Sequence, residues 1–221
     1  MSQRTRGRHV DEGEGTDGHT AGTSRLHPTG DQVLHRRTTV SESLRLENQT
    51  TPRILIYDYH QDDPRKCTSA KLQKFHLARQ LHSLKDIPRS AIVLNPSSNP
   101  TLSFQDRTLI ERYGLVGLDC SWNLSEEILQ NRIKGESRRL PTLLAGNPTN
   151  YSIRGRLSTA EALAAALLIT GFEKEAQRLL AVFNWGHTFL TLNKEPLEAY
   201  LQSSVDEISK QEQEYFPPSV A

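Results

Sequence analysis

The sequence predicts a mixed α/β fold, with a mostly parallel sheet in the N-terminal half and an all-helical C-terminal half. Between residues 51 and 139, short apolar runs typical of strands alternate with helical patterns. Residues 140–221 show mainly helical patterns and are predicted to form a second, helical domain. Residues 1–50 hold nine apolar residues and no aromatic one, so this extension is predicted to be disordered.

The first elements of the predicted sheet lie between residues 53 and 94. Residues 53–59 form a short apolar run that favours a strand. Residues 68–83 then place their apolar side chains mostly on one helical face, which predicts a helix. Residues 91–94 predict a second buried strand, which ends at Asn95-Pro96. The pattern is therefore strand, helix, strand.

The next helix has clear signals at both ends. Ser103 is a good N-cap with Asp106 three residues later, and Gly114 is a typical helix terminator. Residues 115–119 predict a third strand, and a helix with an acidic first turn is expected to start around Ser125.

Residues 140–144 are interpreted as one further strand, after which only helical signals follow. Ser158-Thr-Ala-Glu161 is a capping box that opens an alanine-rich helix ending at Gly171. A second helix is predicted over residues 172–183, and a third from about Pro196. We therefore expect helices to dominate the second half.

Composition excludes several classes of protein. The longest apolar run, residues 162–169, is far shorter than the roughly 20 residues that cross a bilayer, so a cytoplasmic protein without membrane contact is expected. Cys67 and Cys120 are too few for a disulfide framework or a tetrahedral cysteine site, and no metal is expected. The net charge of +1 leaves any RNA contact to local basic clusters.

Several hydroxyl groups lie where predicted helices begin. Thr68 starts the first helix, where free backbone N–H groups and the hydroxyl could bind a ligand carboxylate. Ser158 and Thr159 open a later helix in the same way. Each of these residues could equally be a plain helix cap, and the spacing leaves both readings open.

A carboxylate and an indole follow the third predicted strand. Asp119 and Trp122 would project a negative charge and a π-face into the crevice beyond the strand ends, where ligands usually bind in open α/β sheets. A tryptophan face attracts a cation such as a sulfonium, and a nearby carboxylate can accept a proton. The alternative interpretation has Trp122 in the core and Asp119 as a cap.

Basic residues gather beside these candidate segments and would suit phosphate contacts if they share a face. Such runs are more often solvated surface. The clusters are Arg65, Lys66, Lys71 and Lys74; Arg132, Lys134, Arg138 and Arg139; and Arg154 with Arg156.

Taken in order, these segments resemble the aminocarboxypropyltransferase family that modifies small-subunit ribosomal RNA in archaea and eukaryotes. The resemblance runs from about Ile54 to Tyr200. Its marks are Asp63-Pro-Arg-Lys-Cys-Thr68, Asp119-Cys-Ser-Trp122, Arg139-Leu-Pro141, Ala145-Gly-Asn-Pro148 with Asn150-Tyr151, Leu157-Ser-Thr-Ala-Glu-Ala162, and Phe183-Asn-Trp-Gly186. The sequence departs from the family pattern at Gly146, Ser152, Gly155 and Ser125.

The resemblance implies the trefoil-knotted topology of SPOUT-type RNA methyltransferases and a donor substrate, S-adenosylmethionine. By analogy, Thr68 and Thr159 hold its amino acid end, and Trp122 encloses its methyl group. The remaining contacts implied are backbone at Leu118, Leu140 and Gly155 with ribose and adenine, and packing of Leu94 and Pro96 on the adenine.

The implied reaction transfers the aminocarboxypropyl group to a uridine already converted to N1-methylpseudouridine, late in maturation of the pre-ribosomal particle. Asp119 is the candidate general base. The resemblance also implies a monomer. Three alternatives stay open at this stage: an ordinary RNA methyltransferase, a non-catalytic ribosome assembly factor that binds RNA, and a helical scaffold without a ligand.

Overall fold

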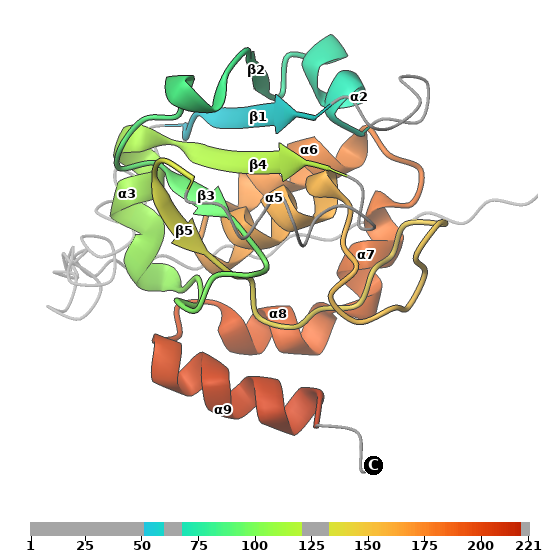
Figure 1. The fold of residues 1–221 in the computed structure, drawn as a ribbon. Helices are drawn as coiled ribbons and strands as arrows, with labels where there is room; N and C mark the ends of the chain where they lie inside the picture. The colour runs from blue at the N-terminus through green and yellow to red at the C-terminus, as the bar shows by residue number, and fades with distance from the viewer. Residues whose placement is uncertain (1–50, 60–67, 121–132, 218–221) are drawn as a thin grey trace, which may run out of the picture. The chain divides into compact units, whose positions relative to one another are not determined.

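The computed structural model describes residues 51–59, 68–120 and 133–217. The described residues form one compact unit built around a parallel sheet (Figure 1). The disordered extension predicted for residues 1–50, the helix expected from Ser125, and Trp122 lie outside the described residues.

The sheet confirms the predicted parallel α/β core. Its five strands are hydrogen-bonded in the order β2-β1-β4-β3-β5, and every neighbouring pair is parallel. Because all strands run in one direction, their carboxyl ends meet at one edge of the sheet. The strands are β1 (Ile54–Asp58), β2 (Arg79–Leu81), β3 (Ile92–Leu94), β4 (Leu115–Asp119) and β5 (Glu136–Arg138).

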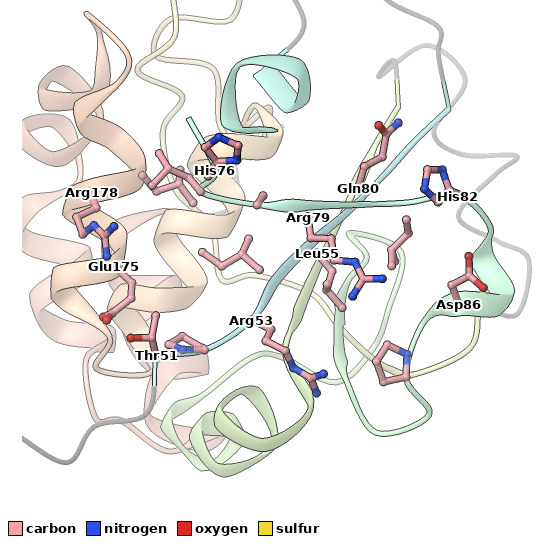
Figure 2. A pocket seen from close by; sticks show the side chains of 17 residues that line it. Thr51, Arg53, Leu55, His76, Arg79, Gln80, His82, Asp86, Glu175 and Arg178 are labelled. Atoms are coloured by element: carbon pink, nitrogen blue, oxygen red, sulfur yellow. The ribbon is translucent and has the colours of Figure 1, made fainter. Parts of the chain in front are cut away.

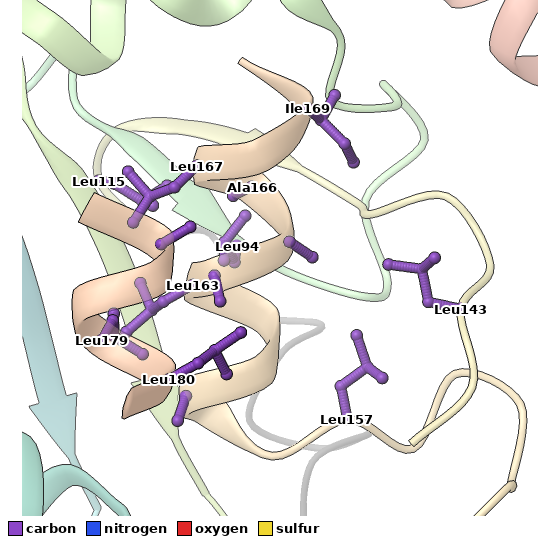
Figure 3. Close-up of a cluster of buried hydrophobic side chains, with 14 of the residues drawn as sticks. Leu94, Leu115, Leu143, Leu157, Leu163, Ala166, Leu167, Ile169, Leu179 and Leu180 are labelled. Atoms are coloured by element: carbon purple, nitrogen blue, oxygen red, sulfur yellow. The ribbon is translucent and has the colours of Figure 1, made fainter. Parts of the chain in front are cut away.

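Both faces of the sheet are buried, because alternate side chains of each strand point to opposite faces. Ile56 and Leu115 belong to the larger core cluster, whereas their neighbours Leu55 and Val116 belong to a smaller cluster. Figure 3 shows part of the larger cluster, where leucines of two helices meet strand residues. The near-continuous apolar strands in the sequence follow from this two-sided burial.

Seven α-helices are seen in the described residues, together with short 3₁₀ turns at Leu84–Asp86 and Phe104–Asp106. The predicted capping boxes at Ser103 and Ser158 are both formed. The helices are α2 (Thr68–Lys74), α3 (Arg107–Tyr113), α5 (Thr159–Ile169), α6 (Glu173–Ala181), α7 (Gly186–Leu192), α8 (Lys194–Tyr200) and α9 (Val205–Tyr215).

Helix α5 is the central helix of the unit and lies with α6 across one face of the sheet (Figure 1). Its alanine-rich sequence is buried almost all round, as expected for a helix enclosed by other elements. It approaches β4 at Gly117, where an added Cβ would meet Thr159 Cγ2 at 3.0 Å. The glycine therefore brings the start of α5 close to the end of β4.

The helix predicted over residues 68–83 was too long. Helix α2 ends at Lys74, His76 takes a positive φ of 56°, and Arg79–Leu81 forms the edge strand β2. Leu77, with neighbouring Ala78, packs against the larger core beside Leu72, which explains the apolar spacing that suggested one helix. Pairing with β1 overrides that local pattern.

The strand predicted over residues 140–144 was also wrong. Only Leu144 forms a single bridge, with Arg154, while the fifth strand is the polar segment Glu136–Arg138. An edge strand needs little apolar sequence, so β5 carried no strand signal.

The last predicted helix is two helices. Helix α8 ends at Tyr200, Gln202 takes a φ of 61°, and Ser204 caps α9 with a further capping box to Glu207. Helix α7 was not predicted. None of the helices in the described ranges is long and apolar enough to cross a membrane.

Candidate functional site

Two carboxylates lie side by side at the carboxyl edge of the sheet. Asp58 ends β1 and Asp119 ends β4, and the two are paired in the register of these neighbouring strands. Each accepts a hydrogen bond from a hydroxyl at the start of a helix: Ser69 Oγ lies 3.1 Å from Asp58 Oδ2, and Thr159 Oγ1 lies 2.7 Å from Asp119 Oδ1. Two adjacent carboxylates of this kind suit a cationic ligand.

The residue after β1 belongs to the same edge. The backbone N–H of Tyr59 donates to the carbonyl of Asp119 at 3.0 Å, which continues the pairing of the two strands beyond their ends. Burial, with smaller contributions from Cys120 and Tyr57, raises the pKa of the Tyr59 phenol. The phenol therefore stays neutral at physiological pH.

A buried glutamate holds the loop that leads into α5. Glu161 is fully buried and accepts hydrogen bonds from the backbone N–H groups of Gly146 and Asn147 at 2.7 and 2.9 Å. It also accepts from Asn147 Nδ2 and from the backbone and hydroxyl of Ser158, each at 2.7 Å. One carboxylate thus joins both ends of the loop from 146 to 158.

A second carboxylate holds the segment after β5. Glu212 of α9 pairs with the Arg139 guanidinium through two contacts of 3.1 and 3.0 Å. It also accepts from the backbone N–H and the hydroxyl of Thr142, at 2.8 and 2.6 Å. Burial would raise the pKa of Glu212, but the hydrogen bonds from Arg139 and Thr142 outweigh it and lower the pKa.

Two further side chains fix the same segment. Asn193 Oδ1 accepts from the Leu144 N–H at 2.7 Å, and Asn193 Nδ2 donates to the Leu144 carbonyl at 2.8 Å. The buried Tyr200 hydroxyl donates to the Thr142 carbonyl at 3.3 Å. The segment from 139 to 147 has little regular structure, and the side chains of Asn193, Tyr200 and Glu212 satisfy several of its backbone groups.

The predicted ligand residues flank these features. Leu94 is buried at the end of β3, Leu118 precedes Asp119 in β4, and Leu140 is partly buried just after β5. The segments that follow β3 and β5 are joined to each other: Asn95 N–H donates to Arg138 O, and Leu102 N–H to Arg139 O.

Two predicted residues are exposed. Pro96 is solvent-exposed in the turn after β3, and Gly155 is exposed with a φ of 70°. The Gly155 N–H donates to the Leu143 carbonyl at 2.8 Å, which attaches its loop to the segment after β5.

Of the predicted site residues, Asp119 and Thr159 are brought into direct contact. Thr68 begins α2, next to the Ser69 that bonds Asp58. Trp122 lies outside the described residues.

Sequence reasoning missed several residues that shape this edge. Asp58 lies one residue before the end of the strand predicted over residues 53–59, so the strand-end rule that singled out Asp119 could have identified it as well. Glu161 was recognised only as a capping-box partner. The roles of Asn193 and Glu212 depend on contacts with residues far away in the chain, which no local pattern reveals.

A cavity of about 680 Å³ lies elsewhere, along the edge strand β2 and the amino end of β1. Figure 2 shows Arg53, Arg79 and Arg178 among its lining side chains, with His76 and His82. The two carboxylates lie at the opposite end of the parallel strands. We therefore do not assign the candidate site to this cavity. In the described part of the chain, no group of three His, Cys, Asp or Glu side chains is arranged to hold a metal ion.

Comparison with known proteins identifies relatives that match most of this chain. Residues 92–216 match the family described as "Ribosome biogenesis protein, C-terminal". A 16S rRNA aminocarboxypropyltransferase from Saccharolobus islandicus strain L.S.2.15 is 45% identical over 162 residues, which cover 73% of this chain and 95% of the relative. The chain belongs to this aminocarboxypropyltransferase family.

Other members of the family agree. A 16S rRNA aminocarboxypropyltransferase from Methanosarcina mazei is 45% identical over 158 residues, 69% of this chain and 90% of the relative. The solved structure of the SAM-dependent rRNA:acp-transferase Tsr3 from Vulcanisaeta distributa is similar with a TM-score of 0.69 at 40% identity. It covers 74% of this chain and 88% of that one. The resemblance read from the motifs is thereby confirmed.

A second family match lies in the N-terminal part of the sheet region. Residues 52–85 match a possible Fer4-like domain in RNase L inhibitor. An iron–sulfur cluster takes four cysteine ligands, and Cys67 is the one cysteine in this stretch of sequence. The aminocarboxypropyltransferase chain therefore lacks the ligand set for such a cluster there, and we read the match as similarity of the β1–α2–β2 region.

Proposed function

We propose that this chain transfers the 3-amino-3-carboxypropyl group of S-adenosylmethionine to a base of small-subunit ribosomal RNA, with release of methylthioadenosine. The observation that carries the proposal is the 45% identity to an aminocarboxypropyltransferase along 95% of that relative's length. The carboxylate pair at the sheet edge supports it, because the donor carries a sulfonium and an ammonium group.

We assign the amino acid end of the donor to the carboxyl edge of the sheet. Thr159 bonds Asp119, and Thr68 precedes Ser69, which bonds Asp58. The two threonine hydroxyls would bind the carboxylate and ammonium groups between them. The hydrogen bond of 2.7 Å from Thr159 to Asp119 supports this assignment, since it fixes both side chains before the donor binds.

We assign the adenosine to the segments that follow β3, β4 and β5. Leu94 and Pro96 would pack on the adenine, and the backbone at Leu118, Leu140 and Gly155 would bind ribose and adenine. The firm anchoring of the segment from 139 to 147 by Glu212 and Asn193 supports a role that depends on backbone position. Trp122 would enclose the donor's methyl group, so that the γ-carbon faces the acceptor.

The proposed reaction is a single displacement. A ring nitrogen of the pyrimidine attacks the γ-carbon, and the bond between this carbon and sulfur breaks. The electron pair of that bond passes to sulfur, which converts the sulfonium into a neutral leaving group. Asp119 takes the proton of the ring N–H, or stabilises the positive charge on the ring nitrogen while water takes this proton, and positioning supplies much of the remaining rate enhancement.

The acceptor proposed is N1-methylpseudouridine, which places the step late in maturation of the pre-ribosomal particle. We also propose that the chain acts as a cytoplasmic monomer and that its topology is a trefoil knot. Within it, residues 51–139 would supply the sheet edge, and residues 140–221 would complete the donor site. The contacts of Glu161, Asn193 and Glu212 with residues 139–147 support this division of roles.

The reaction is tested with donor labelled in either the carboxyl or the methyl carbon. Purified protein is incubated with small-subunit RNA from cells that lack this enzyme. We expect carboxyl label without methyl label in the RNA. Methyl label alone would identify a methyltransferase, and stable RNA binding without either label would identify an assembly factor.

The role of Asp119 is tested by Asp119→Asn. Loss of a general base typically costs between about 100-fold and 10,000-fold in rate, so turnover at saturating donor should fall by at least about 100-fold. The control is Asp86→Asn, an exposed carboxylate beside the cavity at β2, which should turn over normally. Normal turnover by Asp119→Asn would remove the residue from the mechanism.

A further inference from the structure

The loop between Ala145 and Leu157 presents large apolar side chains to solvent. Tyr151 is 56% exposed and Ile153 is 46% exposed, beside the exposed Arg156. The exposure of large apolar side chains to water is unfavourable. Several such side chains exposed together on one surface are typical of a binding site.

Hydrogen bonds hold the loop that carries these exposed side chains in a defined conformation. The Ser152 N–H donates to the Ala145 carbonyl at 2.7 Å, and the Ala145 N–H donates to the Ile153 carbonyl at 3.1 Å. Ser152 takes a φ of 61°, a strained conformation for a residue with a Cβ. Such strain persists where the surroundings impose it and is common at binding sites.

The charged residues within the loop and the segment before it all have one sign. Residues 137–160 contain four arginines and no acidic residue. Arg138 pairs with Asp106, and Arg139 pairs with Glu212. Arg154 donates to the Pro217 carbonyl and lies over the Phe216 ring. Arg156 is exposed and forms no ion pair with any described residue, so its charge is available to an anionic partner.

The loop also lies near the proposed chemistry. Thr159, which bonds Asp119, is eight positions after Tyr151 in the sequence. A chain of that length spans at most about 29 Å even when fully extended. If the acceptor base of an RNA strand lies at Asp119, a base only a few nucleotides away along the same strand could therefore contact Tyr151.

We propose that Tyr151, Ile153 and Arg156, here called the Tyr151 patch, bind single-stranded RNA next to the acceptor base. Tyr151 stacks on a neighbouring base, Ile153 extends the apolar platform, and Arg156 contacts a phosphate. An aromatic ring beside arginine on a rigid loop is the combination that single-stranded RNA binders use. The inference rests on the proposed function for the identity of the RNA.

The test is a binding measurement that needs no turnover. A fluorescein-labelled single-stranded RNA with the sequence around the acceptor uridine is titrated with protein, and S-adenosylmethionine binding is measured separately by calorimetry. We expect Tyr151→Ala to weaken RNA binding about 10-fold and to leave donor affinity unchanged. Tyr151→Trp, which keeps the ring face, should bind RNA within about 2-fold of the native protein. Arg156→Gln should reduce the slope of log affinity against log salt by about one.

Tyr113→Ala is the matched control, because Tyr113 is 38% exposed at the end of α3, far along the chain from the loop. Equal RNA affinity for Tyr151→Ala and Tyr113→Ala would overturn the proposal. A parallel loss of donor affinity in Tyr151→Ala would also overturn it, since the residue would then support the donor site. If the native protein binds both ligands but transfers no carboxyl label, the proposed reaction fails while the RNA contact stands.

Discussion

At the scale of single residues, Glu161 shows how one buried carboxylate can organise a site that it does not enter. Its two oxygens accept hydrogen bonds from the start and the end of the loop between Gly146 and Ser158. That loop carries both the Tyr151 patch and Gly155. Glu161 therefore fixes the positions of residues for which we propose binding roles.

Glu161→Gln should destabilise the protein by about 2–4 kcal/mol. The amide replaces one acceptor oxygen with a donor group, and a buried N–H that loses its partner costs roughly 1–3 kcal/mol. Urea unfolding followed by circular dichroism measures the change. Glu207→Gln is the control, since Glu207 is exposed, makes the same capping-box contact at the start of α9, and should change stability far less. Equal effects of the two variants would contradict the role given to Glu161.

Asp119 and Thr159, which are in contact in the structure, could be proposed as site residues from the sequence because each sits at a local signal, a strand end or a helix start. Asn193 and Glu212 could not, because their functions come from contacts with Leu144 and Thr142, 49 and 70 residues away. Side chains that serve distant backbone groups leave no periodic pattern.

At the scale of elements, the close packing of α7 against α6 depends on a glycine. Gly186 begins α7, and a Cβ at this position would lie closer to the carbonyl oxygen of Leu180 than van der Waals contact permits. This explains why glycine occupies a helix start at which alanine would otherwise favour the helix by about 1 kcal/mol.

Gly186→Ala should therefore lower stability by about 1–3 kcal/mol, because backbone contact outweighs helix propensity. The comparison variant is Gly155→Ala, where a Cβ would meet nothing within 4 Å and only the φ of 70° opposes the change. It should cost about 1 kcal/mol. Thermal unfolding of both variants tests this, and a stabilised Gly186→Ala protein would contradict the contact.

Elements were predicted best from the sequence where the spacing of apolar residues matched the burial that the structure shows. Strands β1, β3 and β4 are apolar and buried on both faces, and α5 has a capping box at its start. The edge strands β2 and β5 were missed because each is three residues long and is held mainly by pairing with a neighbour. Edge pairing is a tertiary effect that short polar sequences do not encode.

At the scale of the whole molecule, Glu212 links helix α9 to the segment that follows the sheet. Its pKa is lowered in the folded state, so it contributes stability above pH 4.5, the ordinary value for glutamate. That contribution is lost as the pH falls through the lowered folded pKa. Acid should therefore loosen this link.

Glu212→Gln should flatten the acid limb of the stability curve. The native protein should lose stability more steeply than the variant below pH 4.5, while the variant is less stable at neutral pH. Urea unfolding at a series of pH values measures both. Parallel curves for the two proteins would show that Glu212 has the same pKa folded and unfolded.

The strand order has a consequence for how the chain folds. Strand β1 pairs with β4 although β2 and β3 lie between them in the sequence. Likewise, β3 pairs with β5 although β4 lies between them in the sequence. Nearly all sheet contacts thus join residues that are far apart along the chain. During folding, the chain must therefore lose the entropy of closing long loops before most of the stabilising contacts can form. Refolding should be slow for a domain of this size, and substitutions in the central strand β4 should slow it more than substitutions in the edge strands.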